Sequence, residues 1–167
     1  LSNTNLSGVD LFKANIQDAN LLETNLSNVT LNGANLDGAN LRNTDLTRLN
    51  LSGVDLSNKN LTGANLSGVD LSNQDLTGTI LTYAKLSGAN LNGVDLSGVD
   101  LRNKDLTGTI LSGVDLSNKD LTGTNLSGVN LRNHVLTGTI LVNANFVGAD
   151  LYRVDLSHKD LTGTILT

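Results

Sequence analysis

The sequence predicts an all-β solenoid, a rod of short stacked units, and two observations carry this prediction. Leucine returns at every fifth residue from Leu1 to Leu166, and the exceptions at this position are Ile16 and Phe146. All 17 glycines lie two residues after that position. A period of five matches neither an α-helix nor a β-strand. A fixed internal period is typical of chains in which each unit buries its apolar face against its neighbours.

Each position of the five-residue unit has its own chemistry. The glycines share their position with asparagines such as Asn58, and both residue types tolerate a positive φ. We therefore expect a turn in every unit with a left-handed third residue, as a type II turn requires. Two residues before the leucine the chain mostly carries Ala, Val or Thr, which fit beside the leucine inside a narrow tube. The residue directly before the leucine is mostly Asp or Asn, which bonds to backbone groups at a bend.

Composition limits the class of protein. Residues 1–167 contain no composition change or linker, so we expect one domain. Because the chain starts on the repeat without a Met and ends within a unit, we expect it to be a segment of a longer product. No apolar run reaches the roughly 18 residues of a membrane span, and no signal-peptide pattern is present. We expect no membrane contact and a soluble protein, and we favour the cytoplasm. With a net charge of −5 and no basic footprint, direct binding to nucleic acid is not expected.

The repeat resembles a known family. Its motif, A(D/N)LXX, recurs along the whole chain, for example at Ala34-Asn35-Leu36, Ala64-Asn65-Leu66 and Ala149-Asp150-Leu151. The chain is therefore similar to the pentapeptide-repeat proteins. This resemblance implies a right-handed, four-sided (quadrilateral) parallel β-helix with twenty residues in each coil, and about eight coils stacked at roughly 4.8 Å. From Leu51 onward a larger unit of fifteen residues also repeats, and we interpret it as a duplication. A three-sided helix of fifteen-residue coils fits that unit, but residues 1–50 and 141–155 do not keep it.

Six residues interrupt the column of small residues that should point inward. Each stands third in the frame Ser/Arg, Asn/His, Lys/Gln/His, and Leu-Thr-Gly follows after one further residue. They are Lys59, Gln74, Lys104, Lys119, His134 and Lys159. Because burial of an unpaired ammonium costs several kcal/mol or more, we expect the backbone to turn these side chains outward, with each amine beside an Asp of a neighbouring coil.

No chemistry-bearing constellation stands out, and we expect neither an enzyme nor a cofactor. A catalytic lysine needs a cleft, which a convex rod does not offer. His134 and His158 are the only histidines, and a metal site needs three or four converging ligands. We therefore place both histidines at the surface or at corners, and we expect no metal.

Two candidate interaction surfaces remain. At twenty residues per coil, four acidic residues fall in one column, Asp55, Asp75, Asp95 and Asp115. Like charges at this spacing repel by roughly 1 kcal/mol per adjacent pair in water, so either selection or chance explains the stripe. The second candidate is the apolar trio Val142, Val147 and Tyr152, which replaces Ser or Thr near one end. The alternative is drift in a terminal coil that packs on a missing cap, and we favour this interpretation of the trio.

Three functions follow as hypotheses. The first is a non-enzymatic structural or interaction module that presents a rod to a protein partner. The second follows from the resemblance, because some members that confer quinolone resistance mimic duplex DNA and bind type II topoisomerases. The third is ice binding through the hydroxyl column that begins at Ser7 and ends before Val147, but no second matching ladder lies beside it. Uncovered terminal coils also predict end-to-end self-association.

Overall fold

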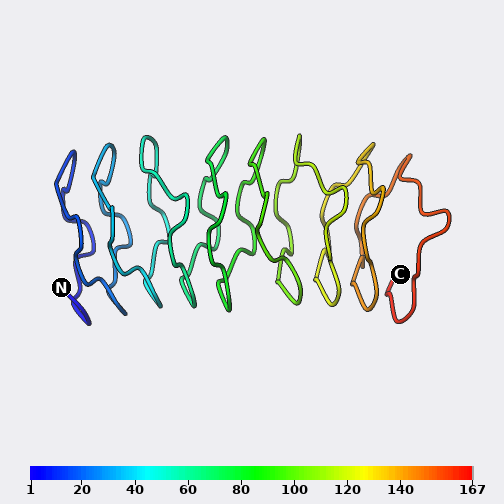
Figure 1. Ribbon diagram of the computed structural model, residues 1–167, viewed down its shortest axis with the longest axis horizontal. Helices are drawn as coiled ribbons and strands as arrows, with labels where there is room; N and C mark the ends of the chain where they lie inside the picture. Colours follow the sequence, from blue (N-terminus) through cyan, green and yellow to red (C-terminus); the bar gives the residue numbers. More distant parts are fainter. Residues whose placement is uncertain (167) are drawn as a thin grey trace.

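The computed structural model describes residues 1–166 as a rod of stacked coils that runs from the N-terminal to the C-terminal end without a change of direction (Figure 1). The rod is a right-handed quadrilateral parallel β-helix. Parallel bridges join residues twenty apart, from Asn5 with Asn25 to Asn145 with Ile165. Each bridge is a single residue long, so residues 1–166 contain neither a longer strand nor a helix, and none of them crosses a bilayer as a helix. The twenty-residue spacing confirms the four-sided coil and contradicts the fifteen-residue one.

Every unit contains the predicted turn. The residue two after the leucine has a positive φ throughout residues 3–163, whether it is glycine, as at Gly98 (φ 73°), or asparagine, as at Asn103 (φ 56°). The turn is closed by a backbone bond across three residues, as from Val9 N to Leu6 O at 3.0 Å. The preference for Gly and Asn in this column therefore has a conformational cause.

The Leu column fills the interior of the rod. Side chains on this column are buried from Leu21 to Phe146, and small residues such as Val99 pack beside them. Burial of one Leu contributes about 1.5–3 kcal/mol. A uniform repeat predicts burial of this column from Leu6 to Leu161, and the buried range is narrower. The first and last coils, including Leu6 and Leu161, are half-buried because a neighbouring coil covers them on one side only.

The Asp or Asn that stands before most of the leucines organises the outer surface. Its side-chain oxygen accepts a bond from the backbone N–H two residues later, as from Ser57 N to Asp55 Oδ1 at 2.8 Å and from Thr62 N to Asn60 Oδ1 at 3.0 Å. This Asx turn explains why Asp and Asn are interchangeable in the column. The exposed sides of the rod are consequently lined by short polar groups that are held by their own backbone.

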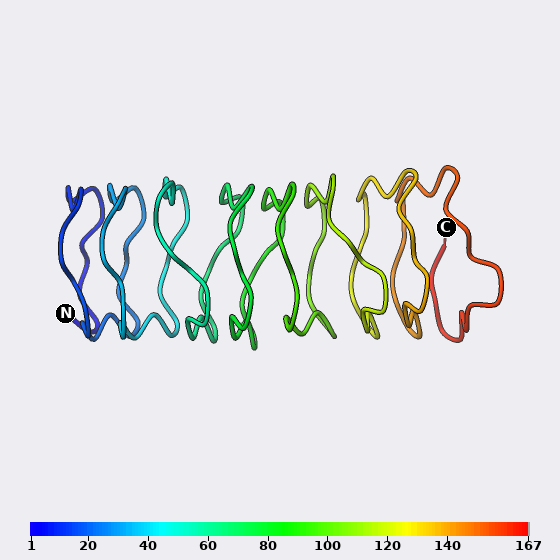
Figure 2. The ribbon, with the colours of Figure 1, turned by 45° about the horizontal axis from the view of Figure 1, so that its top comes forward.

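The four sides of the rod are not equally closed. The bridge columns that start at Asn5 and Asp10 are nearly continuous along residues 1–166. The column that starts at Asn15 keeps only the bridges Asn15–Asn35 and Asp75–Asp95 within the same residues. Uneven spacing between coils is visible when the rod is turned (Figure 2). The backbone ladder therefore joins neighbouring coils more completely on one part of the circumference than on the other.

Candidate interaction surface

The four stripe aspartates occupy one column, as predicted, and all of them are exposed. The spacing along the column is uneven, because Asp75 is bridged to Asp95 whereas the backbone is open between Asp55 and Asp75 and between Asp95 and Asp115. Each carboxylate accepts the backbone N–H two residues later at 2.8 Å. The stripe aspartates therefore stabilise the Asx turns in addition to presenting negative charge.

These hydrogen bonds favour the charged form of three of the stripe aspartates, Asp55, Asp95 and Asp115. The hydroxyl and backbone N–H of Ser57 lower the pKa of Asp55, and Ser97 lowers the pKa of Asp95 in the same way. For Asp115 the backbone N–H of Ser117 is the larger cause of the lowered pKa. Lys59 and Lys119 add smaller attractive contributions, so cations lie near the stripe and offset part of its charge.

The apolar trio does not form one flat patch. Val142, Val147 and Tyr152 follow one another at steps of five residues, and each lies on a different side of the coil. Tyr152 is about half exposed, and the guanidinium groups of Arg132 and Arg153 lie 4.8 and 5.1 Å from its ring centre. A flat partner cannot contact all three side chains at once.

The expectation that six polar residues turn outward was wrong for most of them. Their side chains are half-buried, and several donate to the carbonyl oxygen of the Leu 23 residues earlier, in the preceding coil. Gln74 Nε2 lies 3.0 Å from Leu51 O, and Lys119 Nζ lies 2.5 Å from Leu96 O. Only Lys59 pairs with a carboxylate, that of Asp37 at 3.1 Å. A free lone pair on a turn carbonyl satisfies the buried donor without a counter-charge.

The same six residues open the backbone ladder. Within residues 1–166, the bridge between the following residue and its counterpart one coil earlier is missing at all six. The open pairs are Asn40 and Asn60, Asp55 and Asp75, Lys85 and Asp105, Asp100 and Asp120, Asp115 and Val135, and Ile140 and Asp160. For five of the six, the bridge five residues earlier along the same coil is missing as well. The exception is Gln74, where Asn50 and Asp70 remain bridged. A long side chain does not fit where Ala or Val sits elsewhere, so the two coils separate locally.

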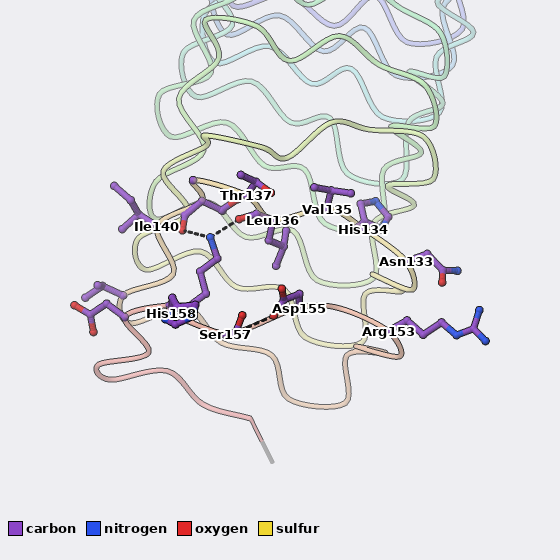
Figure 3. A pocket seen from close by; sticks show the side chains of 15 residues that line it. Asn133, His134, Val135, Leu136, Thr137, Ile140, Arg153, Asp155, Ser157 and His158 are labelled. Carbon is purple, nitrogen blue, oxygen red and sulfur yellow. Dashed lines mark hydrogen bonds between the residues drawn. The ribbon is translucent and has the colours of Figure 1, made fainter.

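Grooves lie between neighbouring coils beside five of these six residues, namely Gln74, Lys104, Lys119, His134 and Lys159. The groove beside Lys159 has a volume of about 860 Å³. Figure 3 shows Val135, Leu136 and Ile140 on one coil, facing Asp155 and Ser157 on the next across this groove. The Lys159 amine reaches across it to the carbonyl oxygens of Leu136 and Thr139. These grooves give the otherwise convex rod concave features.

Neither histidine is placed to bind a metal. His134 is half-buried instead of lying at the surface, and its Nε2 lies 2.9 Å from Leu111 O. Since a carbonyl only accepts, Nε2 carries the proton, and the buried Nδ1 has no partner among residues 1–166. His158 is exposed, as expected. No three His, Asp or Glu side chains of the described chain converge as metal ligands.

The repeat is shared with a known protein family. The sequence model described as pentapeptide repeats matches eight copies here, over residues 1–28, 24–63, 60–93, 89–128 and 130–167. The chain belongs to the pentapeptide-repeat family. No curated protein matches this pentapeptide-repeat sequence.

Solved pentapeptide-repeat structures share the fold. A trypsin-treated variant of QnrB1, a plasmid-mediated fluoroquinolone resistance protein, is 18% identical with a TM-score of 0.75, and the match covers 100% of this chain and 86% of that one. HetL, involved in heterocyst differentiation regulation in Nostoc sp. strain PCC 7120, is 28% identical with a TM-score of 0.42, over 99% and 84% of the two chains. At 18% identity the QnrB1 likeness establishes the fold and no more.

One feature of this pentapeptide-repeat protein escaped the sequence-based prediction. Tyr83 occupies a turn corner with φ 57°, and its side chain is 83% exposed. It borders a groove of about 770 Å³ that opens beside Lys104. A signal was available in the sequence, since Tyr83 is the only residue of its column that is neither Gly nor Asn between residues 53 and 148.

Proposed function

We propose that this pentapeptide-repeat protein is a non-enzymatic interaction module that presents its rigid sides to a protein partner. The observation that carries the proposal is the division of roles within each unit. Leu and small residues fill the interior, and the outward Asp and Asn side chains are bound in Asx turns such as that of Asp95 with Ser97 N at 2.8 Å. The backbone of each side is therefore pre-organised, and little conformational entropy is lost when a partner binds.

The same arrangement argues against acid–base catalysis. A general acid needs a pKa near the working pH, whereas hydrogen bonds lower the pKa of Asp55, Asp95 and Asp115 further from neutrality. Two of the half-buried lysines also lack a free amine, because Lys119 and Lys159 donate to backbone carbonyls. Charged groups of this kind serve recognition better than proton transfer.

Side-specific cross-linking tests the proposal. We would place a photo-reactive side chain at Ser97, beside Asp95, and in a second variant at Ser87, in the hydroxyl column, and would irradiate each in an extract of the organism that encodes the chain. We expect adducts with one protein, formed from one side and suppressed by excess unlabelled chain. Equal adducts from both positions that no competitor suppresses would contradict an interaction role.

A second candidate is a DNA mimic that binds a type II topoisomerase. The Asp55–Asp115 column favours it, because these exposed carboxylates are spaced by successive coils. QnrB1, whose fold is similar, is a fluoroquinolone resistance protein. Lys59 and Lys119 beside the column weaken the likeness to a phosphate backbone. We expect the chain to leave DNA gyrase supercoiling unchanged at micromolar concentration.

If supercoiling is inhibited after all, replacement of the four column aspartates by Asn decides whether the column is responsible. Asn keeps the Asx turn, so the fold should remain and the melting temperature should stay level or rise as repulsion is relieved. Loss of inhibition with retained folding, together with a steep salt dependence of the parent chain, would support the mimic. Unchanged inhibition by the variant would exclude the column.

A further inference from the structure

Tyr83 is held in an unfavourable backbone conformation and gains no burial from it. A bulky residue with positive φ is rare, and Tyr83 has φ 57° with 83% of its surface exposed. One coil later the same corner holds Asn103, which adopts φ 56° at less cost. Strain that no local contact offsets is a reason to consider function.

Lys85 adds a second departure two residues later. Its column holds only Asp or Asn otherwise from Asn5 to Asn145. The Asp and Asn side chains of this column bond to the N–H two residues on, as Asp105 does with Thr107 at 3.1 Å. A lysine has no acceptor, so it cannot make that turn. Within three residues, Tyr83 thus lacks a favourable backbone conformation and Lys85 lacks the hydrogen bond of the Asx turn.

The groove beside these residues offers an acceptor. The backbone ladder is open between Lys85 and Asp105, and the resulting groove is lined by Tyr83 and Asp105 among others. Thr107 N, Thr107 Oγ1 and Asn125 Nδ2 all bond to Asp105 Oδ1. Among residues 1–166 nothing donates to Asp105 Oδ2, so this oxygen is available to a ligand.

The chain itself shows which group completes such a pair. At its other tyrosine, the guanidinium of Arg132 lies 4.8 Å from the Tyr152 ring centre, and Arg132 Nε donates to Asp150 Oδ2 at 2.6 Å. No cation lies over the Tyr83 ring within residues 1–166. The nearby Arg102 is already committed to Asp100 through two bonds of 2.9 and 2.8 Å.

We propose that Tyr83 and Asp105 form a docking site for an arginine side chain of a protein partner. The guanidinium stacks on the exposed ring and donates to Asp105 Oδ2, the same two kinds of contact that Arg132 makes with Tyr152 and Asp150. This site rests on the proposed interaction function, because it names the chemistry by which a partner is held. A planar guanidinium can stack face-on against the ring while its edge donates to the carboxylate, whereas a lysine ammonium has no planar face to stack.

Net charge contributes little to this site. The groove has three carboxylates and three cations, namely Asp100, Asp105, Asp120, Lys85, Arg102 and Lys104. Attraction over long distances is therefore small, and binding depends on ring contact and hydrogen-bond geometry.

The test uses a blocked glycyl-arginyl-glycine peptide as the probe, with the lysine and citrulline peptides as controls. The chain has two tyrosines and no tryptophan, so the Tyr152→Phe variant reports on Tyr83 alone through ring NMR shifts and fluorescence. We expect saturable shifts of the Tyr83 ring and the Asp105 amide with the arginine peptide. We expect at least a several-fold weaker response with lysine or citrulline.

Two variants separate site from fold. Tyr83→Asn introduces the residue that the corner accepts at Asn103, and Asp105→Asn keeps the Asx turn, so both should fold and both should lose the arginine response. Equal shifts for all three peptides, an unchanged response in Tyr83→Asn, or no shift at all would overturn the docking site. The cross-linking experiment remains independent, since a partner captured elsewhere on the rod refutes this site and leaves the interaction function intact.

Discussion

Lys119 Nζ donates to Leu96 O at 2.5 Å and thereby links two coils whose backbone bridge, between Asp100 and Asp120, is missing. Leu96 O also accepts Val99 N at 2.9 Å, so both of its lone pairs are used. A side chain has taken the place of part of the backbone ladder.

Lys119→Val should close this opening. The same column holds the buried Val99 one coil earlier, so valine fits, and removal of a half-buried ammonium together with apolar burial should raise the free energy of unfolding by about 1–3 kcal/mol. Urea denaturation measures the gain, and slower hydrogen exchange of the Asp120 amide reports the restored ladder. Lys119→Met is the matched control, since it keeps the length and should leave the ladder open. Equal exchange rates in the two variants would contradict a steric cause.

Leu91→Ala should lower the free energy of unfolding by about 2–5 kcal/mol. Leu91 is 1% exposed in the middle of the rod, where coils on both sides prevent collapse of the cavity. Leu6→Ala, in the half-buried first coil, should cost clearly less. Chemical denaturation of both variants compares them, and equal losses would mean that the Leu column is not the main source of stability.

Gly98→Val should destabilise the chain by about 1–3 kcal/mol, and Ser97→Val should cost much less. Gly98 has φ 73°, and an added Cβ would lie 3.7 Å from Gly78 N, an ordinary contact. The penalty therefore comes from conformation, not from lack of space. Gly98→Asn is the control, because Asn118 occupies the same corner one coil later with φ 59°. Similar melting temperatures for the Val and Asn variants would refute this explanation.

Stability should fall as the pH drops from about 4 toward 2. The side-chain bonds from Arg102 hold the pKa of Asp100 at about 2, below the ordinary value of 3.8. A carboxyl group whose pKa is lower in the folded state stabilises the fold above its ordinary pKa, and this contribution disappears as pH falls through the folded value. Melting temperatures across this range test it, and Asp100→Asn should show a shallower decline. An identical decline in both proteins would exclude a contribution from Asp100.

End-to-end association of the 167-residue chain is the remaining prediction. Leu1 is 58% exposed and Leu166 is 47% exposed, and open backbone edges pair readily with another chain. Sedimentation should show a mass that rises with protein concentration, and Leu166→Lys should shift the equilibrium toward monomer. A single monomeric species at every concentration would exclude coaxial stacking.

The burial and backbone conformation of residues in columns with little sequence variation could be predicted correctly from the sequence. In each such column a single physical requirement determines which residue types are accepted. Leu91 must be inside and Gly98 must take a positive φ, whatever the neighbouring coils contain. The position of the Lys119 side chain depends on a property that one column does not reveal. This property is how far two coils can separate and which carbonyl oxygen then becomes available. The prediction treated an inward lysine as forbidden, whereas the rod opens locally and satisfies it.

The candidate surfaces divide in the same way. The Asp55–Asp115 column was found from the period, but its uneven spacing arises from Gln74 and Lys119, which lie in other columns. Tyr83 was missed because an isolated aromatic residue in a repeat looks like variation until its φ and exposure are known.

The uneven closure of the backbone ladder should make the bending stiffness of the rod depend on direction. The nearly continuous bridge columns from Asn5 and Asp10 join the coils on two sides of the rod. The interrupted column that carries Asp55 and Asp115 leaves the coils largely unjoined on another side. Bending that pulls the coils apart on the bridged sides is resisted by backbone hydrogen bonds, whereas bending that pulls them apart on the interrupted side stretches only side-chain links such as that of Lys119. The rod should therefore be stiff in one direction and compliant in another. A partner that grips the aspartate column would meet the side whose spacing can adjust to it.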